Sequence, residues 1–207
     1  THYQHDPMVE SSIGKGLVMS VLVDKEGTVW AGTYDGGLCR LNSDETFQCF
    51  IYDKNDPSSI SNDRVYGISE DKDGYLWLAT SDGFNRFSPK TGKFDRYMDD
   101  PASKVGFKGK GAYGSIVDLH GTVWIASRNG GLVRYEPGTD TFTQFKHEPL
   151  NPHSISHDRV FAITQSDDGI IWLATKKGLN RFDPNYDFFE YFGKPHGLHN
   201  DTTYAVA

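Results

Sequence analysis

The chain has 207 residues, of which 37% are apolar and 14% aromatic, and its net charge is −7. Because the positive charges are not gathered into a cluster, the composition argues against binding to nucleic acid or to an anionic membrane surface. No apolar run approaches the roughly 18 residues that a membrane-spanning helix needs. The length suits one sizeable domain or two small ones.

A repeat runs through the chain with a period close to 47 residues. One series is a tryptophan in a short apolar segment, spaced by 47, 47 and 48 residues: Trp30, Trp77, Trp124 and Trp172. A second series is an arginine that follows a glycine, spaced by 46, 48 and 47 residues: Arg40, Arg86, Arg134 and Arg181. Two series with one period predict a repeat architecture.

In chain order, THYQHD (1–6) matches the end of a repeat and predicts a leading outer strand. Four complete units follow, and each is predicted to hold four short strands joined by tight turns. Their approximate bounds are 15–52, 62–98, 109–146 and 157–192. The last residues, TTYAVA (202–207), match the first strand of a further unit and predict a trailing inner strand.

The second unit shows the pattern of a unit in detail. RVYGISE (64–70) alternates apolar with small or polar residues, and DKDG (71–74) is an Asp-Gly hairpin signal. YLWLAT (75–80), FNRFS (84–88) and KFDRYM (93–98) complete four predicted strands. No segment keeps a helical period.

A meander of four antiparallel strands in every 40 to 50 residues is typical of a propeller blade. The second strand of each unit is apolar on both faces, as expected when a blade packs between two neighbours. We therefore predict an all-β propeller with four complete blades over 1–207, in which the tryptophans fill the space between blades. Since four blades are few for a closed ring, we expect a part of a larger propeller of about seven blades.

The units resemble the two-component regulator propeller repeat. The resemblance is carried by SISNDRVYGISEDKDGYLWLATSDGFNRFSPKTGKF (59–94) and SISHDRVFAITQSDDGIIWLATKKGLNRFDP (154–184). The third unit departs from it, because SKVGFKGKGAYGSIVDLHG (103–121) lacks the serine-rich entry.

This resemblance implies an extracytoplasmic, periplasmic sensor module of a bacterial signalling protein. Such modules lie upstream of a membrane span and an output domain such as a histidine kinase or a diguanylate cyclase. The implied partner is a small polar ligand or a carbohydrate, with no cofactor and no metal. The region is expected to be non-catalytic.

The candidate ligand-binding residues precede the innermost strands, where the loops of such a scaffold carry function. They are Asn62, Asp63, Arg64, His157, Asp158, Arg159, Asn200 and Asp201. The alternative is that these polar side chains bond to their own backbone and fix the loops. The divergent stretch 99–112 is the place where a difference in specificity is expected.

Three further groups have a structural interpretation beside a functional one. The repeated arginines are predicted to pack their stems on a blade face with a paired head group. Cys39 and Cys49 are predicted to lie directly opposite each other, either as a cross-strand disulfide or as two small buried apolar residues. The spacing of His196 and His199 is compatible with two metal ligands, but the sequence fixes no third.

Two rival functions stay open. Streptogramin lyases are propellers with similar repeats, and in an enzyme His157, His199 and the loop acids would be the acid–base candidates. In a scaffold, the faces of the propeller would bind protein partners, another propeller half or a second copy of the chain. Raw blade faces and strand edges favour such self-association.

Overall fold

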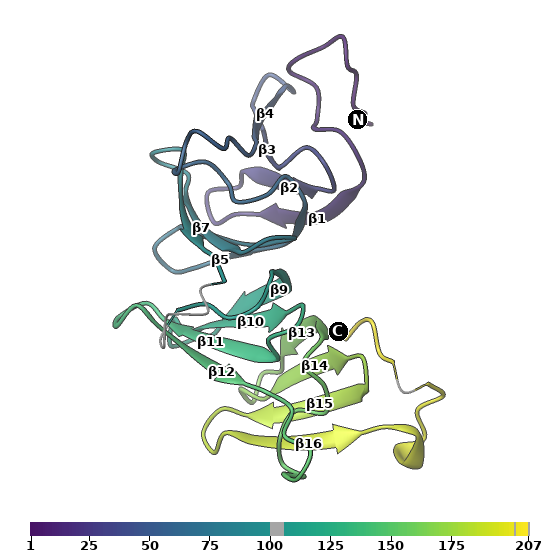
Figure 1. Cartoon of the computed structure of the whole chain (residues 1–207). Helices are drawn as coiled ribbons and strands as arrows, with labels where there is room; N and C mark the ends of the chain where they lie inside the picture. Colours follow the sequence, from purple (N-terminus) through teal and green to yellow (C-terminus); the bar gives the residue numbers. More distant parts are fainter. Residues whose placement is uncertain (100–105, 201, 207) are drawn as a thin grey trace. The chain divides into compact units, whose positions relative to one another are not determined.

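The computed structural model describes residues 1–99, 106–200 and 202–206. Within them the regular elements are sixteen β-strands and one short 3-10 helix, η1 (Lys194–His196). The strands form four antiparallel sheets of four, which we call blades 1 to 4 in chain order (Figure 1). The predicted all-β architecture of four propeller blades is confirmed. The chain divides into two compact units of two blades each, Thr1–Tyr97 and Met98–Ala207, where the sequence analysis treats it as one domain.

The first unit contains blades 1 and 2, and each sheet follows chain order. Its strands are β1 Val18–Val23, β2 Val29–Thr33, β3 Leu38–Leu41, β4 Phe47–Phe50, β5 Val65–Glu70, β6 Leu76–Thr80, β7 Phe84–Ser88 and β8 Lys93–Tyr97. The first hairpin of each blade turns at a glycine, Gly27 or Gly74, whose φ is 84° or 80°. A residue without a Cβ reaches this conformation at no steric cost, which is why an Asp-x-x-Gly turn recurs here.

The second unit contains blades 3 and 4 and repeats the same meander. Its strands are β9 Ala112–Val117, β10 Val123–Ser127, β11 Leu132–Glu136, β12 Thr141–Phe145, β13 Val160–Gln165, β14 Ile171–Thr175, β15 Gly178–Asp183 and β16 Phe188–Phe192. All sixteen strands fall within the four ranges expected from the repeat.

The apolar core of each unit lies where one blade packs on the next. In the first unit the Trp30 ring of blade 1 meets the Phe87 ring of blade 2 edge to face, with centroids 5.4 Å apart. In the second unit Trp124 of blade 3 meets Phe182 of blade 4 in the same way, also at 5.4 Å. Both indoles are at most 2% exposed, so each fills space between two sheets.

The leading strand predicted at 1–6 is wrong, because these residues are not in a strand. A strand needs a hydrogen-bonded neighbour, and no described residue provides a ladder for this segment. Its packing nevertheless follows the repeat. The Tyr3 ring lies 5.2 Å from Phe47, as the corresponding ring of blade 1, Phe50, lies 6.1 Å from Phe94 of blade 2.

The trailing strand predicted at 202–207 is wrong for residues 202–206, which form no ladder, and residue 207 lies outside the described residues. One backbone bond joins the Thr203 N–H to the Thr175 carbonyl at 3.0 Å. The Tyr204 ring packs on Phe161 in a tilted arrangement with centroids 4.9 Å apart, as Phe161 packs on Tyr113 at 5.5 Å. The segment has the side-chain contacts of an inner strand without its backbone pairing.

Candidate functional site

Three loops that lead into blades 1, 2 and 4 share one hydrogen-bonded skeleton. We call them the connecting loops: residues 5–14, 52–61 and 147–156. In each, a serine hydroxyl accepts a bond from the N–H and donates one to the carbonyl of the residue six positions earlier. These serines are Ser12, Ser59 and Ser154. The same backbone is therefore built three times from different loop sequences.

In blade 2 the connecting loop is tied to the sheet by a buried Ser–Thr–Asn cluster. The Asn85 side chain accepts a bond from the Ser61 N–H at 2.9 Å and donates one to the Ser61 hydroxyl at 2.8 Å. The Ser61 and Thr80 hydroxyls lie 3.0 Å apart, and Thr80 also bonds the carbonyl of Gly83. All three polar side chains are nearly inaccessible, so each needs these partners.

Blade 4 contains the same cluster in Ser156, Thr175 and Asn180. The Asn180 amide bonds the Ser156 N–H at 2.9 Å and its hydroxyl at 2.7 Å, and the two hydroxyls are 2.9 Å apart. Sequence reasoning missed this cluster. The signal was present, since the serine that ends S-I-S and the asparagine of G-x-N-R recur at the repeat period.

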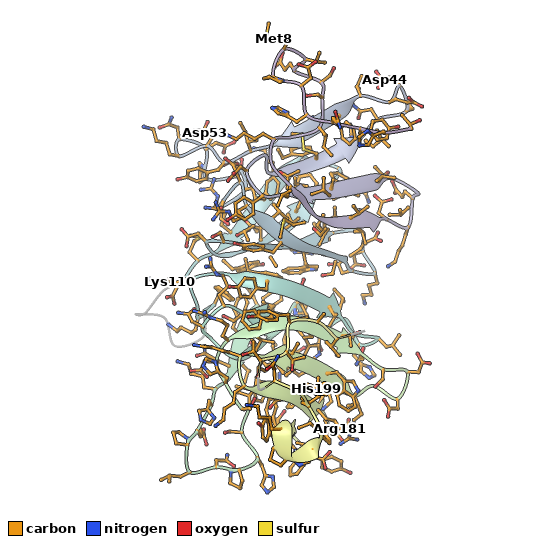
Figure 2. All side chains as sticks on the ribbon, turned by 90° about the vertical axis from the view of Figure 1, so that its right-hand side faces the viewer. Met8, Asp44, Asp53, Lys110, Arg181 and His199 are labelled. Atoms are coloured by element: carbon orange, nitrogen blue, oxygen red, sulfur yellow. A yellow bond between two sulfur atoms is a disulfide. The ribbon has the colours of Figure 1, made fainter. Side chains whose placement is uncertain are left out.

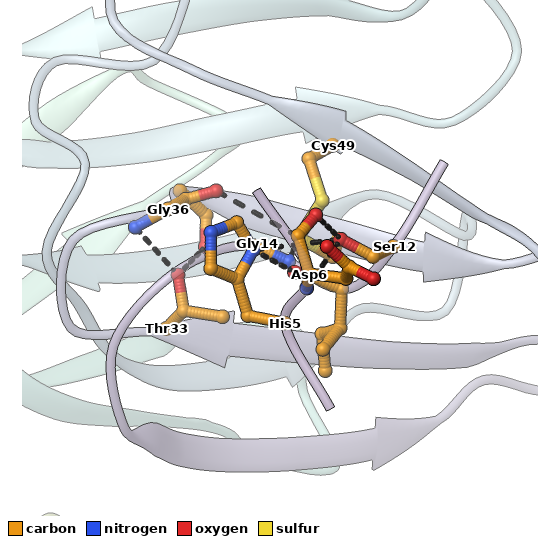
Figure 3. Close-up of a disulfide and its surroundings, with 10 residues drawn as sticks. His5, Asp6, Ser12, Gly14, Thr33, Gly36 and Cys49 are labelled. Atoms are coloured by element: carbon orange, nitrogen blue, oxygen red, sulfur yellow. Dashed lines mark hydrogen bonds between the residues drawn. A yellow bond between two sulfur atoms is a disulfide. The ribbon is translucent and has the colours of Figure 1, made fainter. Parts of the chain in front are cut away.

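In blade 1 the serine and asparagine positions hold Gly14 and Cys39. The Gly14 N–H points at the Cys39 sulfur at 3.3 Å, and Cys39 forms a disulfide with Cys49. The two cysteines lie directly opposite each other on β3 and β4, as the register requires. Figure 3 shows Cys49 beside the connecting loop, with His5, Asp6 and Ser12 around it. Of the two alternatives for these cysteines, the structure contains the disulfide.

The predicted ligand-binding residues of blade 2 are largely engaged with the backbone. The Asp63 carboxylate accepts the Tyr52 N–H at 2.6 Å, and the Asn62 side chain accepts the Arg64 N–H at 3.0 Å. The Arg64 guanidinium lies 3.8 Å from the Tyr34 ring centroid and donates to the Asp35 carboxylate at 3.3 Å.

In blade 4 the equivalent residues make equivalent contacts. Asp158 accepts the His147 N–H at 2.7 Å, and the His157 Nδ1 accepts the Arg159 N–H at 2.9 Å. Arg159 is exposed and donates its Nε to the Arg128 carbonyl at 3.3 Å. Its terminal nitrogens make no hydrogen bond to the described residues.

The His157 imidazole is held in its neutral form. A backbone N–H can only donate, so Nδ1 must be unprotonated to accept it. Burial, followed by the positive charge of Lys176, lowers the pKa of His157, and Asp158 opposes this in part. His157 is thus a positioning acceptor for its loop at neutral pH.

The third predicted group lies at the end of the chain. Asn200 is exposed, and Asp201 is outside the described residues. The divergent stretch 99–112 is described only in part, since 100–105 are also outside. Its Phe107 is 1% exposed and takes the place of Ile60 and Ile155 in the other loops.

The described residues contain no group of three or more His, Cys, Asp or Glu placed to hold a metal ion. The Nδ1 of His196 accepts the Gly193 N–H at 3.2 Å, and His199 is exposed. No helix in the described part of the chain is long and apolar enough to cross a membrane.

The Asp-x-x-Gly turns position the tryptophans. In blade 2 one Asp71 oxygen accepts the N–H groups of Asp73 and Tyr75, and the other accepts the Trp77 indole at 2.9 Å. Asp24 and Asp118 bond Trp30 and Trp124 in the same way. In blade 4 the position holds Ser166, and Trp172 is partly exposed. These acids have a structural task and do not form a cation loop.

The repeated arginines lie on the blades with partners for their head groups. Arg40 donates to Gln48 at 2.8 Å, and Arg86 lies 3.6 Å from the Tyr75 ring centroid. Arg134 pairs with Glu136 at 3.6 Å, and Arg181 pairs with Glu190 at 3.4 Å.

The two segments that contain the Ser–Thr pair of the cluster, 59–82 and 154–177, match the family model of the two-component regulator propeller. The chain contains two-component regulator propeller repeats. No segment of blade 1 or blade 3 is matched. No curated protein matches the chain.

Three solved structures illustrate the fold that the chain shares with other proteins. The extracellular domain of a hybrid two-component system from B. thetaiotaomicron has a TM-score of 0.77 and 24% identity, over 91% of this chain and 25% of that one. The extracellular domain of a one-component system from the same organism has a TM-score of 0.55 and 17% identity, over 89% and 30%. Virginiamycin B lyase from Staphylococcus aureus has a TM-score of 0.62 and 18% identity, over 85% and 55%.

These likenesses show the propeller fold. The chain spans about a quarter of the length of the hybrid two-component domain and about half of the lyase. Both sensor neighbours are extracellular domains, whereas the lyase is an enzyme on the same architecture. Fold alone therefore does not decide between sensing and catalysis.

Proposed function

We propose that the chain is a non-catalytic, extracytoplasmic ligand-sensing module of a bacterial signal-transduction protein. The observation that carries the proposal is the match of blades 2 and 4 to two-component regulator propeller repeats. The Cys39–Cys49 disulfide supports the location, because disulfides persist in oxidising compartments. A sensor that faces the cell exterior would experience such conditions.

The ligand class proposed for the candidate ligand-binding residues is a small polar molecule or a carbohydrate. In blades 2 and 4 a buried Ser–Thr–Asn cluster ties down the loop that precedes Asn62 or His157, so in each blade a ligand would meet preorganised groups. Arg159 is the best single contact, since it is exposed and its terminal nitrogens are free of hydrogen bonds to the described residues. Asn62, Asp63, Arg64, His157, Asp158, Asn200 and Asp201 complete the proposed set.

A thermal-shift screen with mono- and oligosaccharides and other small polar metabolites tests this function. A ligand that binds only the folded state stabilises it by about 2.7 kcal/mol at a hundred times Kd. The expected result is a concentration-dependent rise in Tm that Arg159→Ala removes. Arg181→Ala, a matched loss of charge at an ion pair on β15, should keep the shift.

The same compounds should be followed for chemical turnover. Turnover that depends on His157 or His199 would replace sensing by catalysis and overturn the proposal. A full panel without any shift, at concentrations that saturate comparable sensors, would count against ligand sensing at these loops.

A further inference from the structure

One register position on the outermost strand differs in every blade. It faces the third-strand residue that is Asn85 in blade 2 and Cys39 in blade 1. The four residues at this position are Cys49, Arg96, Gln144 and Tyr191. Because the connecting loop passes over it, this side chain decides whether the space under the loop is filled.

In blade 2 the Arg96 guanidinium fills that space. Its Nε donates to the Ser59 carbonyl at 2.6 Å, and its Nη2 donates to the Asp56 carbonyl at 2.6 Å. Nη2 also contacts the Asp53 carbonyl and the Ser59 hydroxyl. The Tyr52 ring centroid lies 5.3 Å from the guanidinium carbon. The loop backbone thus forms a carbonyl cluster shaped for a planar cation.

Blade 1 builds the same carbonyl cluster. Asp6, Val9 and Ser12 correspond to Asp53, Asp56 and Ser59, and the turn bonds agree: Val9 N–H to the Asp6 carbonyl at 3.1 Å and Ser12 N–H to the Val9 carbonyl at 3.0 Å. The loop is anchored like its counterpart, with the Phe47 N–H bonded to the Ser11 carbonyl at 2.8 Å. Met8 and Asp53 mark these two loops in Figure 2.

No arginine or lysine of the described residues donates to the blade 1 carbonyl cluster. A titratable nitrogen beside it is on the His5 ring, whose Nδ1 lies 2.8 Å from the Ile13 carbonyl and 3.5 Å from the Ser12 hydroxyl. Cys49, in the place of Arg96, is short and is held to Cys39 by the disulfide (Figure 3). A cavity of about 260 Å³ opens beside Cys49 and the loop. The cavity is lined by Asp6, Val9, Ser12 and Cys49 among others, so it adjoins the residues that hold the guanidinium in blade 2.

The charges around this cavity favour a cation. Four carboxylates line it, Asp6, Glu10, Asp35 and Asp63, against the single ammonium group of Lys15. Asp6 and Asp63 each accept one backbone N–H, and Asp35 pairs with Arg64. Glu10 is exposed and makes no hydrogen bond or ion pair with the described residues.

We propose that the blade 1 cavity binds a guanidinium group supplied from outside the chain, in the position that the Arg96 guanidinium holds in blade 2. The donor is either a small guanidinium compound or an arginine side chain of a peptide, which present the same chemistry. Asp63 is the only residue that this guanidinium site shares with the candidate ligand-binding residues named under the proposed function.

The corresponding space in blade 4 shows why the charge matters. It is a cavity of about 240 Å³ under loop 147–156, next to Tyr191. Lys177 lines this cavity. The carboxylate that lines it, Glu148, already accepts a bond from the Asn151 amide at 3.0 Å. One carboxylate stands against one ammonium group there, whereas four carboxylates stand against one ammonium group in blade 1, so blade 1 is the preferred guanidinium site.

Calorimetric titration of the disulfide-intact chain tests the proposal. The probes are agmatine and acetyl-Gly-Arg-Gly-amide, with acetyl-Gly-citrulline-Gly-amide as the uncharged isostere. Saturable binding of either guanidinium probe and none of the citrulline peptide is expected, and the tighter probe identifies the source. Glu10→Lys should weaken binding by about tenfold or more, whereas Glu26→Lys, at the exposed turn on the opposite edge of the blade, should change it less than about twofold.

The double variant Cys39→Asn/Cys49→Arg supplies the blade 1 loop with its own guanidinium. It should lose probe binding while it keeps a cooperative melting transition. No saturable binding below about 10 mM would overturn the proposal. Equal effects of the two Glu→Lys variants would overturn it as well, because binding would then follow net charge and not this cavity.

Discussion

Blades 1 and 2 have the same connecting-loop backbone but hold it by different chemistry. In blade 2 the loop is bonded to the sheet through Asn85 and filled from below by Arg96. In blade 1 a disulfide stands at the same two register positions, and a cavity takes the place of the arginine. The backbone of the repeat is therefore more constant than the side chains that stabilise it, and the exchange of one side chain can create a site.

The largest effect is expected where a tryptophan lies between two blades. Trp124→Ala should lower the free energy of unfolding by about 3–5 kcal/mol, because it leaves a cavity against Phe182. Trp172→Ala should cost about 1–2 kcal/mol less than Trp124→Ala, since Trp172 is partly exposed and has no acidic partner in its turn. Urea denaturation followed by circular dichroism measures both. If both variants lost the same free energy of unfolding, the bond to the turn acid and the contact between blades would contribute nothing to stability at Trp124.

Removal of the disulfide comes next and tests the comparison directly. Cys39→Ser/Cys49→Ser should destabilise the first unit by about 2–3 kcal/mol, because the bond closes a loop with a sequence separation of 10. Dithiothreitol should lower the Tm of the native chain to that of the double variant and leave the Tm of the double variant unchanged. If reduction does not change the Tm, the disulfide does not stabilise blade 1 in the way that Asn85 stabilises blade 2.

The buried cluster should contribute a comparable or smaller amount. Asn85→Ala removes the acceptor of the Ser61 N–H and the donor to the Ser61 hydroxyl. The free energy of unfolding should fall by about 1–3 kcal/mol. A double-mutant cycle with Thr80→Val should show coupling, because the two side chains share the Ser61 hydroxyl. Asn55→Ala, at an exposed position of the loop, serves as the control and should stay within about 0.5 kcal/mol.

The tryptophan turn of blade 4 can be made to resemble that of the other blades. Ser166→Asp should give the Trp172 indole the acceptor that Asp118 gives Trp124, with a gain of about 0.5–1 kcal/mol. A rise in Tm together with a shift of the tryptophan emission would report the new bond. A loss of stability would show that blade 4 depends on the present Ser166 contacts to Ile170 and Asp168.

The smallest expected effect is on pH dependence. The folded pKa of His157 is lowered, so on acidification the unfolded chain takes up the proton first. Stability is then fully retained above the unfolded pKa of about 6.5 and declines as the pH falls below it. His157→Asn, which copies Asn62 of blade 2, should remove this decline between about pH 7 and pH 5. Identical pH profiles of Tm for the two proteins would contradict the assignment.

Much of the architecture could be predicted from the sequence because it is written in local patterns. The Asp-x-x-Gly turns need glycine at a positive φ, and the apolar strand around each tryptophan needs cover on both faces. These features recur at one period, so strand order and register follow. The opposition of Cys39 and Cys49 could be read from the register for this reason.

The candidate site could be predicted only in part. Asn62 and His157 were found as equivalent positions, but their bonds to the backbone of Arg64 and Arg159 depend on how each loop turns. The Ser–Thr–Asn cluster joins residues 24 positions apart. A single sequence shows that such residues repeat but not that they touch.

The sequence by itself determined the four blades, their turns and the place of each tryptophan, because these depend on contacts between near neighbours in the chain. Tertiary structure alone decided which polar residues are consumed by the fold and which stay open to a ligand. That outcome depends on the space beneath a loop, where Arg96 fills one blade and Cys49 leaves another open. Volume and charge at such a place are set by residues from several segments, and only their assembly brings them together.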